Sequence, residues 1–109
     1  MLYWSSKMYL DAGLLKKKKR YQRLLEKNKL TRPLYCITLP VNGENIMEIY
    51  SSAEIWFRWY RKRRMTVVGL ALSRENAEKL VAQICLDTVS REGTISPGLI
   101  HDYFDEPVG

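Results

Sequence analysis

The sequence predicts a small single α/β domain over residues 1–109, with a strand-helix-strand-helix core of parallel strands preceded by a basic amphipathic helix. Three observations predict this class. The chain has the length of one domain, and its 46% hydrophobic content is enough for one modest core. Two runs of β-forming residues, 34–39 and 65–72, stand on either side of a helical pattern. A second helical pattern follows the later run.

The N-terminal third predicts a strand-like segment and then a helix. Residues 1–10 alternate weakly between apolar and polar side chains, which suits a lead-in or an edge strand. Asp11 is a residue type that caps helices, so we expect a helix over 12–28. Pro33 ends this element, because proline cannot continue the helical hydrogen-bond ladder.

Residues 34–39 are rich in β-formers and predict a strand. Residues 46–50 fit either a short helix or a strand. Ser51 and Glu54 have the spacing of a capping box, in which each side chain accepts from the other residue's backbone. A helix over 52–63 is therefore expected to follow.

The C-terminal half begins with the nearly continuous apolar run 65–72, which is typical of a strand covered on both faces. Ser73 is expected to cap the next helix, and Gly93 to end it. The apolar residues of 94–104 predict a docked short helix or turn, and 105–109 a frayed tail.

The sheet is expected to be built around the two main strands. Residues 40–64 are numerous enough for a right-handed crossover, so the sequence predicts that 34–39 and 65–72 run parallel. Two strands make a thin sheet. A third strand is expected from 1–10, from 94–97 or from a second subunit.

One segment carries a resemblance to known sequences. The strand ending Ile37-Thr38-Leu39-Pro40, the run Val67–Ser73 and the helix with Ala77, Leu80 and Val81 resemble a family of short uncharacterised bacterial proteins. The likeness covers about 34–90. It implies a compact α/β fold and carries no assigned activity.

Positive charge gathers in two short stretches. The net charge of the chain is +6. Residues 1–33 carry ten basic and two acidic side chains, and residues 58–64 carry five basic and no acidic ones. The rest of the chain is acidic. The total therefore hides two concentrated cationic segments.

Helical geometry places the first cationic segment on one side of the expected helix 12–28. At 100° per residue, its cations fall between about 140° and 240° from Leu14, over about 16 Å of helix. They are Lys16, Lys19, Arg20, Arg23 and Lys27. Like charges at this spacing weaken a helix, so an anionic partner is one interpretation: RNA or DNA first, or an anionic lipid surface. A solvated face is the other. If the partner is a nucleic acid, Arg61, Lys62 and Arg64 would add contacts to its phosphates.

The expected helix 52–63 carries a wide aromatic arc of about 200°. Its large side chains include Trp56, Phe57, Trp59 and Tyr60. These suit a buried core, a subunit contact or, less favourably, stacking on exposed bases. A protein-interaction or homodimerising module is therefore the second functional hypothesis.

Residues that signal catalysis are sparse. His101 is the only histidine, and no Cys/His set has zinc spacing. Cys36 and Cys85 are expected to be small hydrophobic residues. The sequence predicts no enzyme, no cofactor, no metal and no small-molecule ligand. It also predicts no secretory signal and no membrane span, and hence a cytoplasmic protein.

Overall fold

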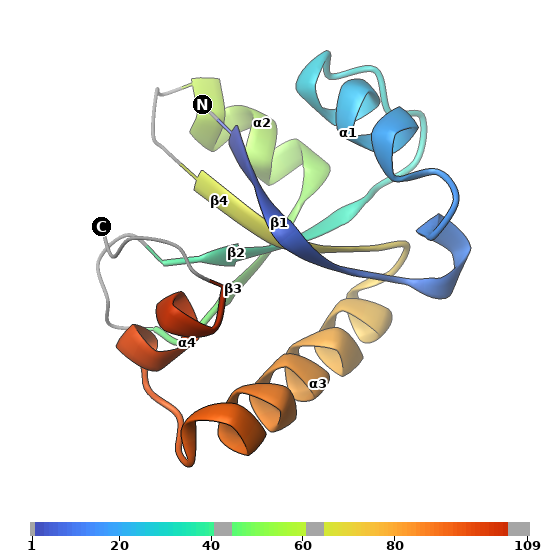
Figure 1. Cartoon of the computed structure of the whole chain (residues 1–109). Helices are drawn as coiled ribbons and strands as arrows, with labels where there is room; N and C mark the ends of the chain where they lie inside the picture. The colour runs from blue at the N-terminus through green and yellow to red at the C-terminus, as the bar shows by residue number, and fades with distance from the viewer. Residues whose placement is uncertain (1, 41–44, 61–64, 105–109) are drawn as a thin grey trace.

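The computed structural model describes residues 2–40, 45–60 and 65–104, without the side chains of 58–60. Together the described residues form a mixed α/β domain (Figure 1). Its elements are β1 (Leu2–Leu10), the short 3₁₀ helix η1 (Ala12–Leu14), α1 (Lys18–Glu26), β2 (Tyr35–Leu39), β3 (Glu48–Ser51), α2 (Ser52–Tyr60), β4 (Met65–Ala71), α3 (Arg74–Glu92) and α4 (Pro97–Phe104).

The four strands form one sheet in the order β1-β4-β2-β3. β1 lies at an edge and pairs parallel with β4, which confirms the expected edge strand and supplies the third strand from this chain. β2 lies between β4 and β3 and is antiparallel to both. The sheet is therefore mixed.

The prediction that β2 and β4 run parallel is wrong. The ambiguous residues near 46–50 form β3, which pairs with β2 from Glu48 opposite Thr38 to Ser51 opposite Tyr35. This extra strand reverses the direction of the chain before α2 begins. The helix therefore connects β3 to β4, which are parallel to each other, with β2 between them.

The expected helix over 12–28 is also wrong at its start. η1 covers three residues, and α1 begins only at Lys18. Asp11, the expected cap, makes no side-chain hydrogen bond to the start of η1. Its carboxylate accepts from the backbone N–H of Leu72 at 3.0 Å and from the side-chain amide of Asn76 at 2.8 Å. The Asp11 carboxylate therefore binds residues distant in the sequence instead of capping the helix that follows it.

These contacts also change the acidity of Asp11. Burial by itself raises the pKa of this carboxyl. The bonds from Leu72 and Asn76, with help from the nearby backbone N–H dipoles of Gly13 and Ala12, outweigh burial and lower the pKa below its ordinary value. Asp11 thus joins the end of β1 to the start of α3 in its ionised form.

The starts of α2 and α3 and the end of α3 follow the expected signals, whereas the expected end of the helix 52–63 and the frayed tail 105–109 lie outside the described residues. The N–H of Ser51 donates to the Glu54 carboxylate at 3.1 Å, and the N–H of Glu54 donates to the Ser51 hydroxyl at 3.3 Å, which confirms the capping box. The hydroxyl of Ser73 accepts from the N–H of Asn76 at 3.1 Å. Gly93 ends α3 in the left-handed conformation with φ 85°.

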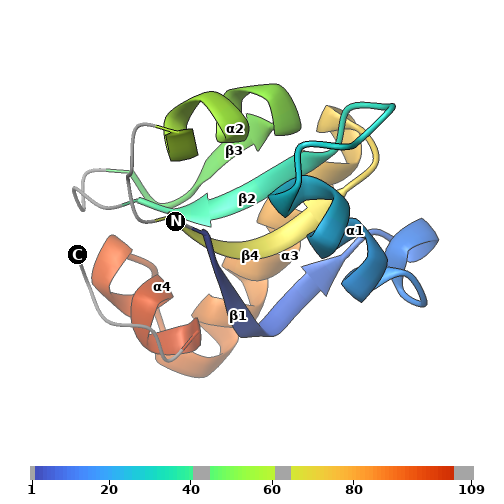
Figure 2. The ribbon, with the colours of Figure 1, turned by 90° about the horizontal axis from the view of Figure 1, so that it is seen from above.

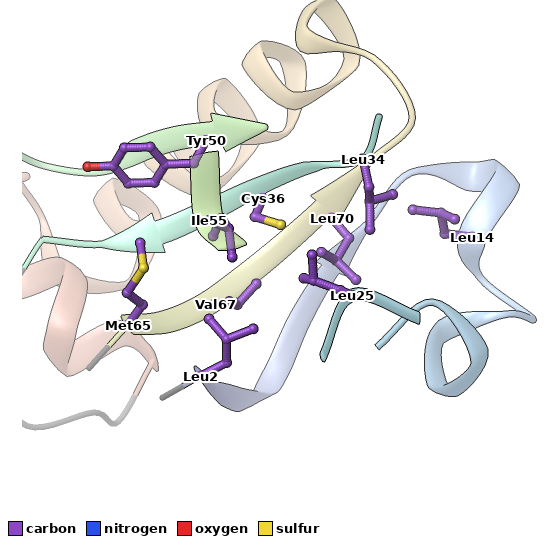
Figure 3. Close-up of a cluster of buried hydrophobic side chains, with 10 residues drawn as sticks. All are labelled: Leu2, Leu14, Leu25, Leu34, Cys36, Tyr50, Ile55, Met65, Val67 and Leu70. Atoms are coloured by element: carbon purple, nitrogen blue, oxygen red, sulfur yellow. The ribbon is translucent and has the colours of Figure 1, made fainter. Parts of the chain in front are cut away.

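Helices cover both faces of the sheet (Figures 1 and 2). α1 and α2 lie on one face, and α3 and α4 on the other. Figure 3 shows the cluster under α1 and α2, where Leu25 of α1 and Ile55 of α2 meet Val67 and Leu70 of β4. Val68 and Ala71 belong to the second cluster, with Ile84 and Phe104 from the helices of the other face. β4 is thus covered on both faces, as its apolar run predicts.

Gly69 in β4 lies at a close approach of β1 and β2. A Cβ at this position would lie 2.8 Å from Cδ1 of Ile37 and 3.1 Å from the carbonyl oxygen of Tyr9. Its neighbours in β1 and β2 therefore leave no room for a side chain.

Candidate functional site

The cations of the N-terminal segment lie at the outer surface of the layer that α1 and α2 form. We define the basic surface as the exposed cations between the end of η1 and the start of β2. They are Lys16, Lys17, Lys19, Arg20, Arg23, Lys27, Lys29 and Arg32. Leu25 and Leu14 are buried beneath them and hold this segment on the sheet.

Four of these cations share one side of α1. At 100° per residue, Lys19, Arg20, Arg23 and Lys27 fall within an arc of about 100°, centred almost opposite Leu25. They span about 12 Å along the helix. The sequence expected Lys16 on the same helix, but Lys16 lies in the turn before α1.

The start of α1 concentrates positive charge further. Lys17 occupies the N-cap position and makes no side-chain capping bond, and the first turn contains no acidic residue. The first turn instead begins Lys18, Lys19, Arg20. Unbonded N–H groups and the helix dipole already make this end positive, so these cations weaken the helix and strengthen the attraction for anions.

Ion pairing distinguishes α1 from α3. On α3, Lys79 lies 3.5 Å from the Glu75 carboxylate, and Arg91 lies 3.5 Å from that of Glu92. Among the described residues, no cation of the basic surface lies within salt-bridge distance of a carboxylate. Neighbouring carboxylates therefore do not neutralise the basic surface within that part of the chain.

The second cationic stretch lies largely outside the described residues. Arg61, Lys62 and Arg64 lie outside the described residues, as do the side chains of Trp59 and Tyr60. Of the expected aromatic arc, Trp56 is half-buried and Phe57 is 59% exposed. Ile55 alone of the three residues 55–57 is fully buried.

A groove of about 430 Å³ lies next to the basic surface. The α1–β2 connection forms one wall with Asn28, Thr31 and Arg32, and the start of α2 contributes Ala53. Tyr35 of β2 also lines it. Sequence reasoning missed this groove and missed Lys17, Lys29 and Arg32 as part of the cationic surface. All three cations lie within the counted segment 1–33, and they were left out because only one side of a continuous helix over 12–28 was considered.

A second polar cluster joins β1, α3 and α4. The Tyr9 hydroxyl donates to the Asp87 carboxylate at 2.5 Å and lies 2.5 Å from the Tyr103 hydroxyl. Burial, followed by the bond to Asp87, raises the pKa of Tyr9. The Lys7 ammonium lies 4.1 Å from the centre of the Tyr103 ring, and Arg91 lies 5.8 Å from it. Because all these groups are partnered, the cluster fastens α4 to the domain.

Cys36 does not form a reactive pair with His101. Burial raises the pKa of the Cys36 thiol to about 12, so it stays protonated near neutral pH. Cys36 lies in the cluster under α1 and α2, whereas His101 is buried in α4 on the other face of the sheet. Burial also raises the pKa of Cys85, which is half-buried on α3.

Within the described ranges, no three His, Cys, Asp or Glu side chains are placed to hold a metal ion together. Of the helices in the same ranges, none combines the length and the apolar character needed to cross a membrane. No family model, curated protein or solved structure matches the chain. The resemblance of residues 34–90 to short bacterial proteins therefore stays a prediction, and function has to be inferred from the side chains themselves.

Proposed function

We propose that the protein is a small non-catalytic nucleic-acid-binding protein whose basic surface contacts phosphates. The observation that carries the proposal is the set of exposed cations from Lys16 to Arg32, none of which is ion-paired with a carboxylate of the described residues. Folding gains nothing from them, since like charges three or four residues apart repel, and cations in the first turn oppose the helix dipole. A bound polyanion would offset both costs.

The dimensions of the surface suit a nucleic-acid backbone. Lys19 and Lys27 are about 12 Å apart along α1. Phosphates of a stacked strand advance by about 3.4 Å along its axis, and those of an extended single strand by more, so this stretch of α1 suits about two to four of them. Contacts of this kind position a strand without reading its sequence. A cytoplasmic location, as expected from the sequence, agrees with such a partner.

Fluorescence anisotropy with a labelled single-stranded 12-mer at 50 mM salt tests the proposal. We expect binding that weakens as salt rises. The triple variant Lys19→Gln, Arg20→Gln, Arg23→Gln should bind at least about tenfold more weakly, with a salt slope shallower by about 2. Lys79→Gln, on α3, serves as the control and should bind like the parent.

Two outcomes would overturn the proposal. One is an absence of binding at 50 mM salt, and the other is a triple variant that binds like the parent protein. Anionic vesicles of equal phosphate content form a separate arm. If the protein binds vesicles and ignores the oligonucleotide, its partner is a lipid surface and the nucleic-acid proposal fails.

The second candidate function is a protein-interaction or homodimerising module that uses α2. Its supporting observation is the exposed Phe57 ring on the outer surface of that helix. A homodimer is not needed to complete the sheet, because β1 and β3 from this chain already extend it to four strands. Light scattering at tens of micromolar tests this candidate. A dimer mass that Phe57→Ser converts to a monomer mass supports it, and a monomer mass for the parent excludes the homodimer.

A further inference from the structure

We propose that the groove beside the basic surface receives an unpaired base from the strand whose phosphates α1 holds. This inference rests on the proposed function and makes it more specific, because it names single-stranded nucleic acid as the ligand class. The groove volume of about 430 Å³ is within the range typical of small-molecule sites.

The groove continues the path of the cations. Lys27 ends α1, Asn28 turns the chain with φ 52°, and Lys29 and Arg32 follow. Asn28 and Arg32 both line the groove, and none of its lining residues that the structure describes carries a carboxylate. A strand that leaves α1 at its C-terminal end therefore passes over the groove while its phosphates stay among cations.

The lining suits a base. Asn28, Thr31 and Arg32 offer an amide, a hydroxyl and a guanidinium, and none of the three makes a hydrogen bond with the described residues. Such groups hydrogen-bond the edges of unpaired bases, and planar guanidinium groups also stack on them. Leu30 and Pro33 provide apolar walls, and Tyr35 contributes a half-buried aromatic side chain.

The start of α2 favours a neutral base over a phosphate. A helix N-terminus ordinarily attracts anions. Here the Glu54 carboxylate already accepts from the Ser51 N–H at 3.1 Å, and Ser51 lines the groove. The N–H of Glu54 is occupied as well, because it donates to the Ser51 hydroxyl at 3.3 Å, so neither N–H is available to an incoming phosphate. The phosphates are thus directed to the basic surface, and an uncharged group is directed into the groove.

Two strands of equal length and phosphate count separate base contacts from phosphate contacts. One is oligo-dT, and the other carries abasic residues in place of every thymidine. We expect the protein to bind oligo-dT about tenfold more tightly, because a base in contact with the groove adds affinity that phosphates cannot supply.

Filling the groove should remove this preference. Ala53 is exposed and lines the groove, so Ala53→Trp occupies the space without altering the charge. We expect equal affinities for the two strands, both near the affinity of the parent for the abasic strand. Ala82→Trp, on the exposed side of α3, is the matched control and should keep the full preference.

A gentler variant keeps the proposal testable if Ala53→Trp fails to fold. Asn28→Gly removes the amide and preserves the left-handed turn, because glycine tolerates a positive φ. The preference for oligo-dT should fall severalfold. If the parent binds both strands equally and with the same salt dependence, the groove proposal is overturned and the proposed function stands. If neither strand binds at 50 mM salt, the proposed function itself fails.

Discussion

Lys19→Glu should stabilise the protein and weaken its binding to nucleic acid at the same time. The substitution places an anion where α1 now has a cation in its first turn, next to the positive end of the helix dipole. It also converts the repulsion between residue 19 and Arg23 into an i, i+4 attraction in the favourable orientation. If the cation is there to bind phosphate, the same change must reduce affinity.

The size of the stability gain follows from two contributions. Reversing the dipole interaction is worth about 0.3–1 kcal/mol for each charge, and reversing the pair with Arg23 about 0.2–0.5 kcal/mol in each direction. Lys19 is exposed, so the lower ends of these ranges apply, and together they amount to about 1 kcal/mol at low salt. For a domain of this length that raises the melting temperature by about 4 °C.

Thermal unfolding at 20 mM salt and anisotropy with the 12-mer provide the two readouts. The salt slope for binding should become shallower by at least about 0.7, the contribution of one phosphate contact on a single strand. Lys79→Glu is the matched control, because it makes the same charge change on α3. It should lose stability by removing the pair with Glu75 and leave binding unchanged. A variant Lys19→Glu that is less stable than the parent, or that binds as well, would refute the reasoning.

Three further substitutions test contacts within the fold. Tyr9→Phe should lower the free energy of unfolding in urea by about 1–2 kcal/mol, because it leaves the half-buried Asp87 carboxylate and Tyr103 hydroxyl without their shared partner. An unchanged urea midpoint would show that the cluster adds nothing to stability. Gly69→Ala should cost about 1–3 kcal/mol in the same measurement, since its Cβ meets a backbone oxygen, and an unaltered stability would contradict this. Asp11→Asn should lower the free energy of unfolding by about 1 kcal/mol at pH 7. The folded-state pKa of Asp11 is lowered, so its contribution is complete above the ordinary value of 3.8 and is lost as the pH falls below it. The difference from the parent should therefore narrow in acid, and a difference independent of pH would contradict the assignment.

Local signals in the sequence predicted most element boundaries. Ser51 with Glu54, Ser73 and Gly93 act within one turn of their own helix, so neighbouring residues are sufficient to predict their roles. The apolar run beginning at Met65 predicted a strand covered on both faces for a similar reason, because its composition reports its surroundings directly.

Long-range contacts account for the two wrong predictions about the fold, the start of the helix 12–28 and the direction of β4 relative to β2. The Asp11 side chain makes no capping hydrogen bond to η1, because its carboxylate accepts from Leu72 and Asn76, more than sixty residues away in the sequence. The direction of β4 relative to β2 depended on whether residues near 46–50 formed a strand. β3 has only four residues, which is too short to show a clear alternation.

In the candidate site, too, the features set by neighbouring residues could be predicted and those set by long-range contacts could not. Five of the eight cations of the basic surface could be predicted, because they follow one another in a single segment over the buried Leu25. The groove could not be predicted, because Asn28, Tyr35 and Ala53 come from three different elements. Its existence depends on how the start of α2 lies against the α1–β2 connection.

The most direct test of the central claim is to map the binding surface by NMR. A ¹⁵N-labelled sample is titrated with the 12-mer at 50 mM salt, and amide shift changes are recorded along the chain. We predict that the largest changes fall in residues 16–32, with residues 51–53 next and the outer side of α3 unaffected. Changes spread evenly over both faces of the sheet, or confined to α3 and α4, would contradict the claim that the basic surface binds nucleic acid.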